Sequence, residues 1–323
     1  MQTIIANQDL ALDQLLSRLD KLHSAPTIAL RVMQLTRDDD FDLTEVARCL
    51  ENDPALAASI LRLANSSYYG LVDGVTSLPH ALAYLGRKSL RLAVLSFALV
   101  KTMVNGAPAH FHQTYWKRSL TMGAAARQCA MLINSPEVDK DTAFAAGLLS
   151  DLGMLVLAQL ETKRYIELSA EPDHLIDLVM REREVLGFDH MAVGARLLVR
   201  WEMPPELIEA VANHHTYLPV SPKLNHVLLV ANLMTEALWT PASPYMQPLQ
   251  LVISGQLNMD VDDIITLAVE TKAAVLETME IFGVTVQGDI DLDAMEEQAR
   301  ELYAAAALDS ATDPDHLEIF VGL

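Results

Sequence analysis

The sequence predicts an all-α protein, and three of its features support that prediction. Apolar residues recur at intervals of three and four along almost the whole chain, which is the spacing of amphipathic helices. Hydrophobic residues make up 51% of the chain but aromatic residues only 6%, a balance that favours helices over strands. No segment alternates convincingly between apolar and polar residues, and no repeat of fixed period indicates a solenoid. We therefore expect a multi-helix bundle.

Local start and stop signals divide the first part of the chain into helices. Leucines from Leu12 to Leu22 form one apolar stripe. Asp53 and Pro54 predict a helix start, with the aspartate as N-cap and the proline at the first helical position. Gly86 is predicted to end a short helix, because glycine is favoured just after a helix C-terminus. The expected helices span 12–22, 43–50, 54–63, 77–86 and 89–103.

Prolines separate the helices expected in the remainder of the chain. Residues 240–248 are rich in proline, serine and threonine, so we expect a flexible linker there. Beyond it, two helices form an acidic C-terminal helical appendage, and residues 309–323 form a tail. The expected helices span 113–133, 139–160, 173–186, 190–201, 205–215, 222–239, 261–282 and 290–308.

The net charge of −20 is distributed unevenly. Seven basic residues and no acidic one lie between Gly74 and Pro136, whereas the segment from Asp260 onward carries 16 acidic residues and two basic ones. The overall sign argues against broad nucleic-acid binding. The asymmetry leads us to hypothesise that the acidic C-terminal helices lie against the basic stretch until a partner competes.

Nothing in the sequence indicates a membrane segment or an oxidising compartment. The N-terminus lacks the positive start and apolar run of a signal peptide. The most apolar stretch, Leu92 to Val100, is too short to span a bilayer. Cys49 and Cys129 lie in separate helical patterns, as buried thiols do in a reducing compartment. We expect a cytoplasmic protein.

Two long segments carry a recognisable pattern. The first is ENDPALAASILRLANSSYYG, from Glu51 to Gly70, followed by VTSLPHALAYLGRKSLRLAVL. The second contains AFAAGLLSDLGMLVL and GFDHMAVGARLLVRWEMPPELIEAVANHH, which ends at His215. Together they resemble the HDOD family, helical proteins related to the HD and HD-GYP phosphohydrolases. The resemblance implies an HDOD domain over 12–240, with an N-terminal helical half (12–110) and a degenerate HD half (111–240), followed by the appendage over 249–308.

The resemblance also implies where a catalytic metal centre would lie. The family pattern has an early histidine, an adjacent His-Asp dyad, further histidines and a late aspartate. This chain has a different residue at three of those positions, and it keeps the aspartate of the dyad and the further histidines. A guanidinium cannot deprotonate to bind a metal. We therefore expect no metal, no cofactor and no catalysis, and a buried Arg118–Asp151 ion pair in place of the dinuclear site. The positions are Arg118, Ser150, Asp151, His190, His214, His215 and Asn232.

Several of these residues have an ordinary structural interpretation. His190 could bond a carbonyl at a helix start rather than bind a metal. His214 and His215 lie in an expected helix, where adjacent side chains point about 100° apart, so at most one would face the site. Arg87, Lys88 and Arg91 could hold a phosphate or an acidic partner, or they could form a solvated helix surface.

The function that these features favour is a non-catalytic signal-transduction module that acts through protein contacts. The resemblance implies response regulators or diguanylate cyclases as partners. Two alternatives remain open. One is a metal-dependent phosphohydrolase with a site around Asp151, His190 and His214. The other is a nucleotide- or cyclic-dinucleotide-binding sensor without turnover.

Overall fold

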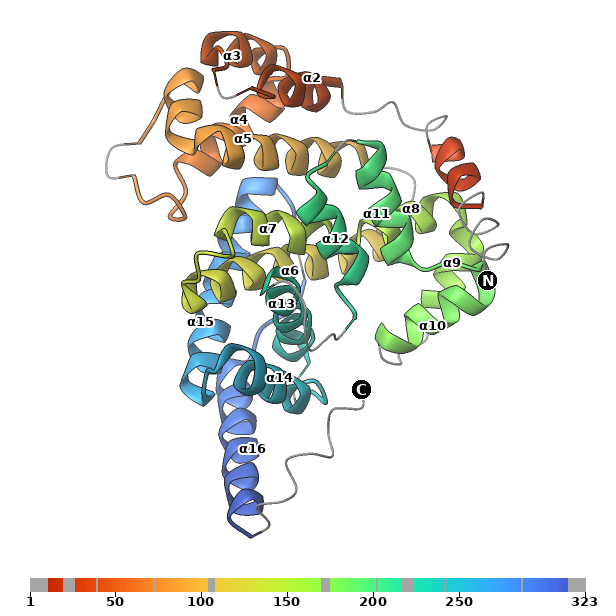
Figure 1. Cartoon of the computed structure of the whole chain (residues 1–323), viewed down its shortest axis with the longest axis vertical. Coiled ribbons are helices and arrows are strands. Elements are labelled where there is room, and N and C mark those ends of the chain that lie inside the picture. Colours follow the sequence, from red (N-terminus) through yellow and green to blue (C-terminus); the bar gives the residue numbers. More distant parts are fainter. Residues whose placement is uncertain are drawn as a thin grey trace.

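The chain is helical throughout its described part in a computed structural model (Figure 1). That part contains α-helices, one short π-helix and no strand, which confirms the predicted all-α fold. The described residues are 11–19, 27–38, 40–71, 74–103, 108–169, 175–201, 203–216, 223–240, 242–285 and 287–312.

Four helices, α2 to α5, pack around a smaller hydrophobic core at one end of the molecule (Figure 1). Asp53 caps α4 as predicted, and its carboxylate accepts a hydrogen bond from the backbone N of Leu56 at 3.2 Å. Gly86 has a φ of 72°, which bends α5 where the sequence predicts a helix end. The helices are α2 (Thr27–Leu35), α3 (Leu43–Glu51), α4 (Pro54–Ala64) and α5 (Leu78–Met103).

The larger core is built around α6 (Ala109–Ile133), which packs against α7, α13 and α15. The leucines of the helical residues 11–19 belong to this core, not to the smaller one. Around α6 lie α7 (Lys140–Leu149), α8 (Leu152–Leu160), α9 (Thr162–Ser169), α10 (Leu175–Leu186), α11 (His190–Arg200), α12 (Pro205–Asn213) and α13 (Lys223–Trp239).

The single helix expected over 139–160 is wrong, because the chain breaks it into α7 and α8 at Ser150 and Asp151. Asp151 has φ −90° and ψ 11°, outside regular helical geometry, and its carboxylate bonds to other elements instead. This stretch, Lys140–Leu160, is long and apolar enough by composition to span a membrane, but 94% of its apolar window is buried inside the protein. It serves here as core.

Gly153 sets the crossing of α8 and α11. A Cβ at this position would lie 1.9 Å from the carbonyl oxygen of His190 and 2.9 Å from the backbone N of Gly194. Only a residue without a side chain permits that approach. The crossing brings the start of α11 next to Asp151, and so it positions His190 at the centre described below.

The C-terminal helices are integrated into the larger core. The flexible linker expected over 240–248 is wrong, because Ser243 and Met246 are buried and α14 begins at Met246. Ile264 and Leu267 are also fully buried, in a helix that packs along α6. The elements are α14 (Met246–Val252), the π-helix η1 (Ile253–Leu257), α15 (Val261–Phe282) and α16 (Leu292–Thr312).

Candidate functional site

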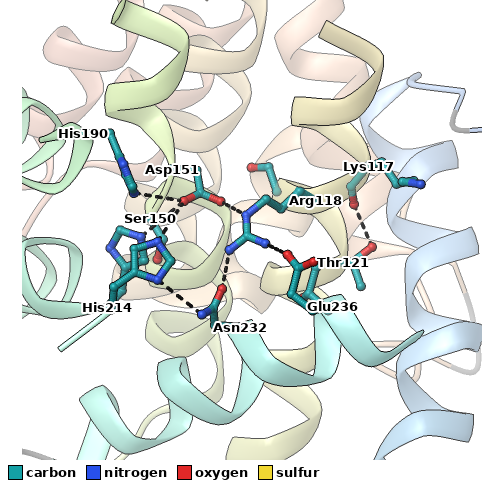
Figure 2. Close-up of polar contacts among 12 residues, drawn as sticks. Lys117, Arg118, Thr121, Ser150, Asp151, His190, His214, Asn232 and Glu236 are labelled. Carbon is teal, nitrogen blue, oxygen red and sulfur yellow. Dashed lines mark hydrogen bonds and ion pairs between the residues drawn. The ribbon is translucent and has the colours of Figure 1, made fainter. Parts of the chain in front are cut away.

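A buried polar centre lies where α6, α11, α13 and the chain breaks after α7 and α12 meet (Figure 2). Arg118, from α6, donates from Nε to Asp151 Oδ2 at 2.5 Å. Its two terminal nitrogens donate to Asn232 Oδ1 and Glu236 Oε1, both on α13. The Arg118 side chain is 10% exposed and that of Asp151 is 1% exposed. The predicted buried ion pair is therefore confirmed, and Glu236 is an additional partner that the sequence did not indicate.

Three histidines face the other oxygen of Asp151. The Nε2 atoms of His214, His190 and His215 lie 3.2, 3.6 and 4.0 Å from Asp151 Oδ1. The expectation that only one of His214 and His215 would face the site is wrong. The reason is that α12 ends at Asn213, so the two residues lie in a turn and not on a regular helix.

A second group of side chains holds His190 from outside. His190 Nδ1 lies 2.7 Å from Glu182 Oε2, and the backbone N of His190 donates to that oxygen at 2.9 Å. Tyr165 donates its hydroxyl to Glu182 Oε1 at 2.6 Å. His190 thus bonds a carboxylate, not the carbonyl expected from its place at a helix start. No sequence motif indicates Glu182 or Tyr165, because α9 and α10 bring them together only in the folded chain.

The remaining ring nitrogens are held by α12 and α13. His214 Nδ1 lies 2.7 Å from the carbonyl oxygen of Val211, and the Asn232 side-chain nitrogen lies 3.3 Å from His215 Nδ1. Ser150 is also buried, but its hydroxyl donates to the carbonyl of Ala146 at 2.7 Å. The serine therefore satisfies its own helix end and contributes no ligand to the centre.

The charges of the centre shift the pKa values of its members. Burial alone would raise the pKa of Asp151, but Arg118 and His214 hold it well below its usual range. Burial alone would lower the pKa of His190, but the carboxylates of Glu182 and Asp151 raise it overall. Burial, with His214 and His190 nearby, keeps the pKa of His215 well below its usual value. Asp151 is therefore ionised and His215 neutral at pH 7.

The basic residues proposed as an anion patch are bonded within the protein. Arg87 donates to the carbonyl of Arg37 at 3.2 Å, and Arg91 donates to that of Thr36 at 3.0 Å. These carbonyls follow the end of α2, where cations are favourable. Lys88 lies 3.5 Å from Asp139 and 3.6 Å from Glu206. The three side chains thus point to different partners.

Comparison with known proteins places this architecture in a family. The family model described as the HDOD domain matches residues 22–217. The chain belongs to the HDOD family. An HDOD domain protein of unknown function from Geobacter sulfurreducens is 22% identical, with 95% of this chain and 97% of that chain covered and a TM-score of 0.58.

Two further relatives show how far the similarity extends. A candidate phosphohydrolase from Shewanella amazonensis SB2B is 21% identical, with 90% of this chain and 94% of that one covered and a TM-score of 0.57. An uncharacterized protein of Treponema pallidum is 24% identical over 212 residues, which are 64% of this chain. The match spans only 40% of that relative's length. At these identities the solved structures establish the shared fold.

On one side of this centre the Arg118 guanidinium occupies the space next to Asp151. The sequence resemblance assigns Arg118 to the early histidine of the family pattern, and its guanidinium donates to both Asp151 Oδ2 and Asn232 Oδ1. Those two oxygens are engaged as acceptors of a permanent cation, so they are not available to a metal ion on that side. The histidine-lined side of Asp151 differs, because four potential ligand atoms lie within 4.8 Å of one another there.

Proposed function

We propose that this HDOD protein is a non-catalytic regulatory module that acts in the cytoplasm through contacts with other signalling proteins. The observation that supports this most is Arg118, which bonds Asp151, Asn232 and Glu236 where the family resemblance implies catalytic metal ligands. We also propose that the HDOD domain extends over 12–240 and that 249–308 is an acidic appendage to it.

The burial of the centre supports the same proposal. The side chains of Asp151, His190 and His214 are between 0% and 1% exposed, and that of His215 is 3% exposed. A phosphate ester must reach the ion or nucleophile that attacks it, and it must exclude solvent as it binds. A centre closed by the protein itself offers no such access without rearrangement of the surrounding helices.

An activity assay on the full chain tests the absence of catalysis. Cyclic dinucleotides and a chromogenic phosphate monoester are incubated with the protein, with and without added Mn²⁺. We expect turnover equal to that of buffer for the wild type and for Asp151→Asn. Turnover by the wild type that disappears in Asp151→Asn would overturn the proposal.

A binding assay tests the regulatory part. Receiver domains of response regulators and diguanylate cyclases are the partner classes that the family resemblance implies. Purified members of each class from the same genome are measured against the immobilised full chain. We expect saturable binding to at least one of them, and binding to none in either class would contradict this choice of partners.

The second candidate function is a metal-dependent phosphohydrolase, and the histidine cluster around Asp151 favours it. The activity assay above distinguishes it from the first. No separate contact supports the nucleotide-sensor alternative, because Arg87, Lys88 and Arg91, on which it depends, bond carbonyls and carboxylates of this chain.

A further inference from the structure

The histidine-lined side of the centre has the spacing of a metal-ligand set. Asp151 Oδ1 lies 3.2 Å from His214 Nε2 and 3.6 Å from His190 Nε2. Metal–ligand bonds of about 2.0–2.1 Å in a tetrahedral site place ligand atoms about 3.4 Å apart. Charge-assisted hydrogen bonds are shorter, about 2.7–2.9 Å. The 3.2 Å contact is a long hydrogen bond and the 3.6 Å separation is longer than one, and both lie near the spacing of ligands around an ion.

The outer partners of the rings orient two ring nitrogens toward Asp151. His214 Nδ1 faces the carbonyl of Val211, which can only accept, so this nitrogen carries the proton. His190 Nδ1 likewise faces the Glu182 carboxylate. In both rings Nε2 is the atom that faces Asp151 Oδ1, at a hydrogen-bond distance for His214, and His190 Nε2 is buried with no hydrogen-bond partner in the described part of the chain. A bound ion would take the place of any proton on these two atoms. Metal-binding histidines commonly donate their other N–H to a carboxylate or carbonyl in this way.

His215 differs from the other two histidines. Arg118 only donates, so the Asn232 oxygen must face Arg118 and the amide nitrogen must face His215 Nδ1. The neutral His215 ring then carries its proton on Nε2, the atom that points toward Asp151. His215 therefore closes the fourth side of the site but offers no lone pair there.

The net charge of the centre is compatible with a bound divalent cation. Asp151, Glu182 and Glu236 supply three negative charges, and Arg118 supplies one positive charge. These four groups sum to −2, so a divalent cation would balance them where an uncompensated buried charge is costly. Glu236 also bonds Arg118 directly, which offsets its repulsion of a second cation.

We propose that this side of the centre holds one divalent transition-metal ion, bound by Asp151 Oδ1, His190 Nε2 and His214 Nε2, with a structural role. Imidazole and carboxylate ligands suit Zn²⁺ and its neighbours. The proposal departs from the sequence-based expectation of no metal, which rested on Arg118, Ser150 and Asn232 at the ligand positions and on the expected divergence of His214 and His215. It does not depend on the proposed function, since a buried ion without hydrolysis is compatible with a non-catalytic module.

Metal content of the full chain tests the site directly. The protein is purified without chelator, and a second sample is stripped with chelator and reloaded with Zn²⁺ or Co²⁺. We expect about one tightly bound ion per chain after reloading, a visible absorption band for the Co²⁺ form, and a higher melting temperature with Zn²⁺ than in chelator. A wild-type protein that binds no ion after reloading, with protons on the imidazoles instead, would overturn the proposal.

Glutamine variants separate the ligands from their neighbours. His190→Gln and His214→Gln should lose the ion, whereas His215→Gln should keep it. His226→Gln, at a buried histidine of α13 outside the cluster, is the matched control and should behave as the wild type. Glu182→Gln should weaken binding about 10–100-fold, as loss of an outer partner does.

Circular dichroism in chelator shows which variants fold without the ion. Retention of the ion at full stoichiometry by a folded His190→Gln/His214→Gln protein would exclude this ligand set. If these variants do not fold, the wild-type stoichiometry and the Co²⁺ spectrum decide alone. The hydrolysis assay is read independently, so a failure of the metal site and a failure of the proposed function remain distinguishable.

Discussion

Replacement of Arg118 by methionine tests how strongly the buried centre depends on its guanidinium. The change leaves Asp151 ionised with 1% of its side chain exposed, and it leaves the buried Asn232 oxygen without its donor. Loss of one partner of a buried ion pair costs about 3–5 kcal/mol of unfolding free energy. Glu236 adds little, because its side chain is 26% exposed and water can solvate it. We expect a loss within that range.

A double-mutant cycle separates the pair from the packing. Asp151→Leu alone leaves Arg118 buried with a weaker set of acceptors, whereas Arg118→Met with Asp151→Leu removes both charges. The double variant should be more stable than either single one, with a coupling energy of about 2–3 kcal/mol. The measurement is urea unfolding of the full chain in chelator, so that no ion contributes. Arg31→Met is the control, since Arg31 and its partner Glu45 are 54% and 53% exposed and the change should cost at most about 1 kcal/mol. Single losses that add within about 0.5 kcal/mol would refute the reasoning.

Three further predictions concern packing, thiol chemistry and pH. Gly153→Ala should cost at least about 3 kcal/mol by urea unfolding, since its Cβ would overlap the backbone of His190, whereas Gly255→Ala, with open space around it, should change stability little. Burial raises the pKa of Cys129 to about 12, so a thiol reagent should modify Cys49 first in the native protein and Cys129 only on unfolding; equal rates for the two would contradict this. Burial alone would raise the pKa of Asp139, but bonds from Thr142 and the charge of Lys88 lower it, so its stabilising effect is complete above about pH 4 and is lost as pH falls through the lower folded value. Asp139→Ala should therefore cost about 1 kcal/mol at pH 7 and less at acidic pH, and a difference independent of pH would exclude the ionised cap.

The helix boundaries that the sequence predicts well have local chemical causes. Asp53 and Pro54 start α4, and the positive φ of Gly86 bends α5, because a capping carboxylate and a glycine act within their own segment. The break at Ser150 and Asp151 has no such signal. Every residue from Leu152 to Leu160 is buried, so apolar periodicity continues across the break and predicts one helix. Composition likewise indicates a linker where tertiary packing buries Met246.

The family resemblance and the need for charge pairing predict some residues of the centre but not all of them. The pairing of Arg118 with Asp151 follows from the need to neutralise a buried charge, and the structure confirms it. Glu182 lies in a helix that also contains exposed positions, and Glu236 is itself only partly buried, so nothing in the sequence marks either one as a partner of the centre. The convergence of His214 and His215 depends on where α12 ends, and a one-turn uncertainty in that end reverses the prediction.

The C-terminal helices show why charge asymmetry was an incomplete guide to their position. The hypothesis places them against the basic stretch 74–136, and α15 does pack along α6 within that stretch. The contacts, however, are largely apolar: the rings of Phe97 and Phe282 lie 4.4 Å apart, and Ile264 is fully buried in the larger core.

Charged groups of the basic stretch are meanwhile engaged within the first 240 residues. Arg118 bonds Asp151, Arg127 lies 3.2 Å from Asp141, and Lys117 lies over the ring of Trp239. The acidic Glu277 of α15 instead accepts from the backbone N of Ser67 at 2.6 Å. Burial of apolar side chains is nearly insensitive to salt, whereas exposed ion pairs are screened by it. A partner that displaced α15 would therefore have to replace core contacts, so competition for the basic stretch requires partial unfolding of the larger core and not the release of a weakly docked tail.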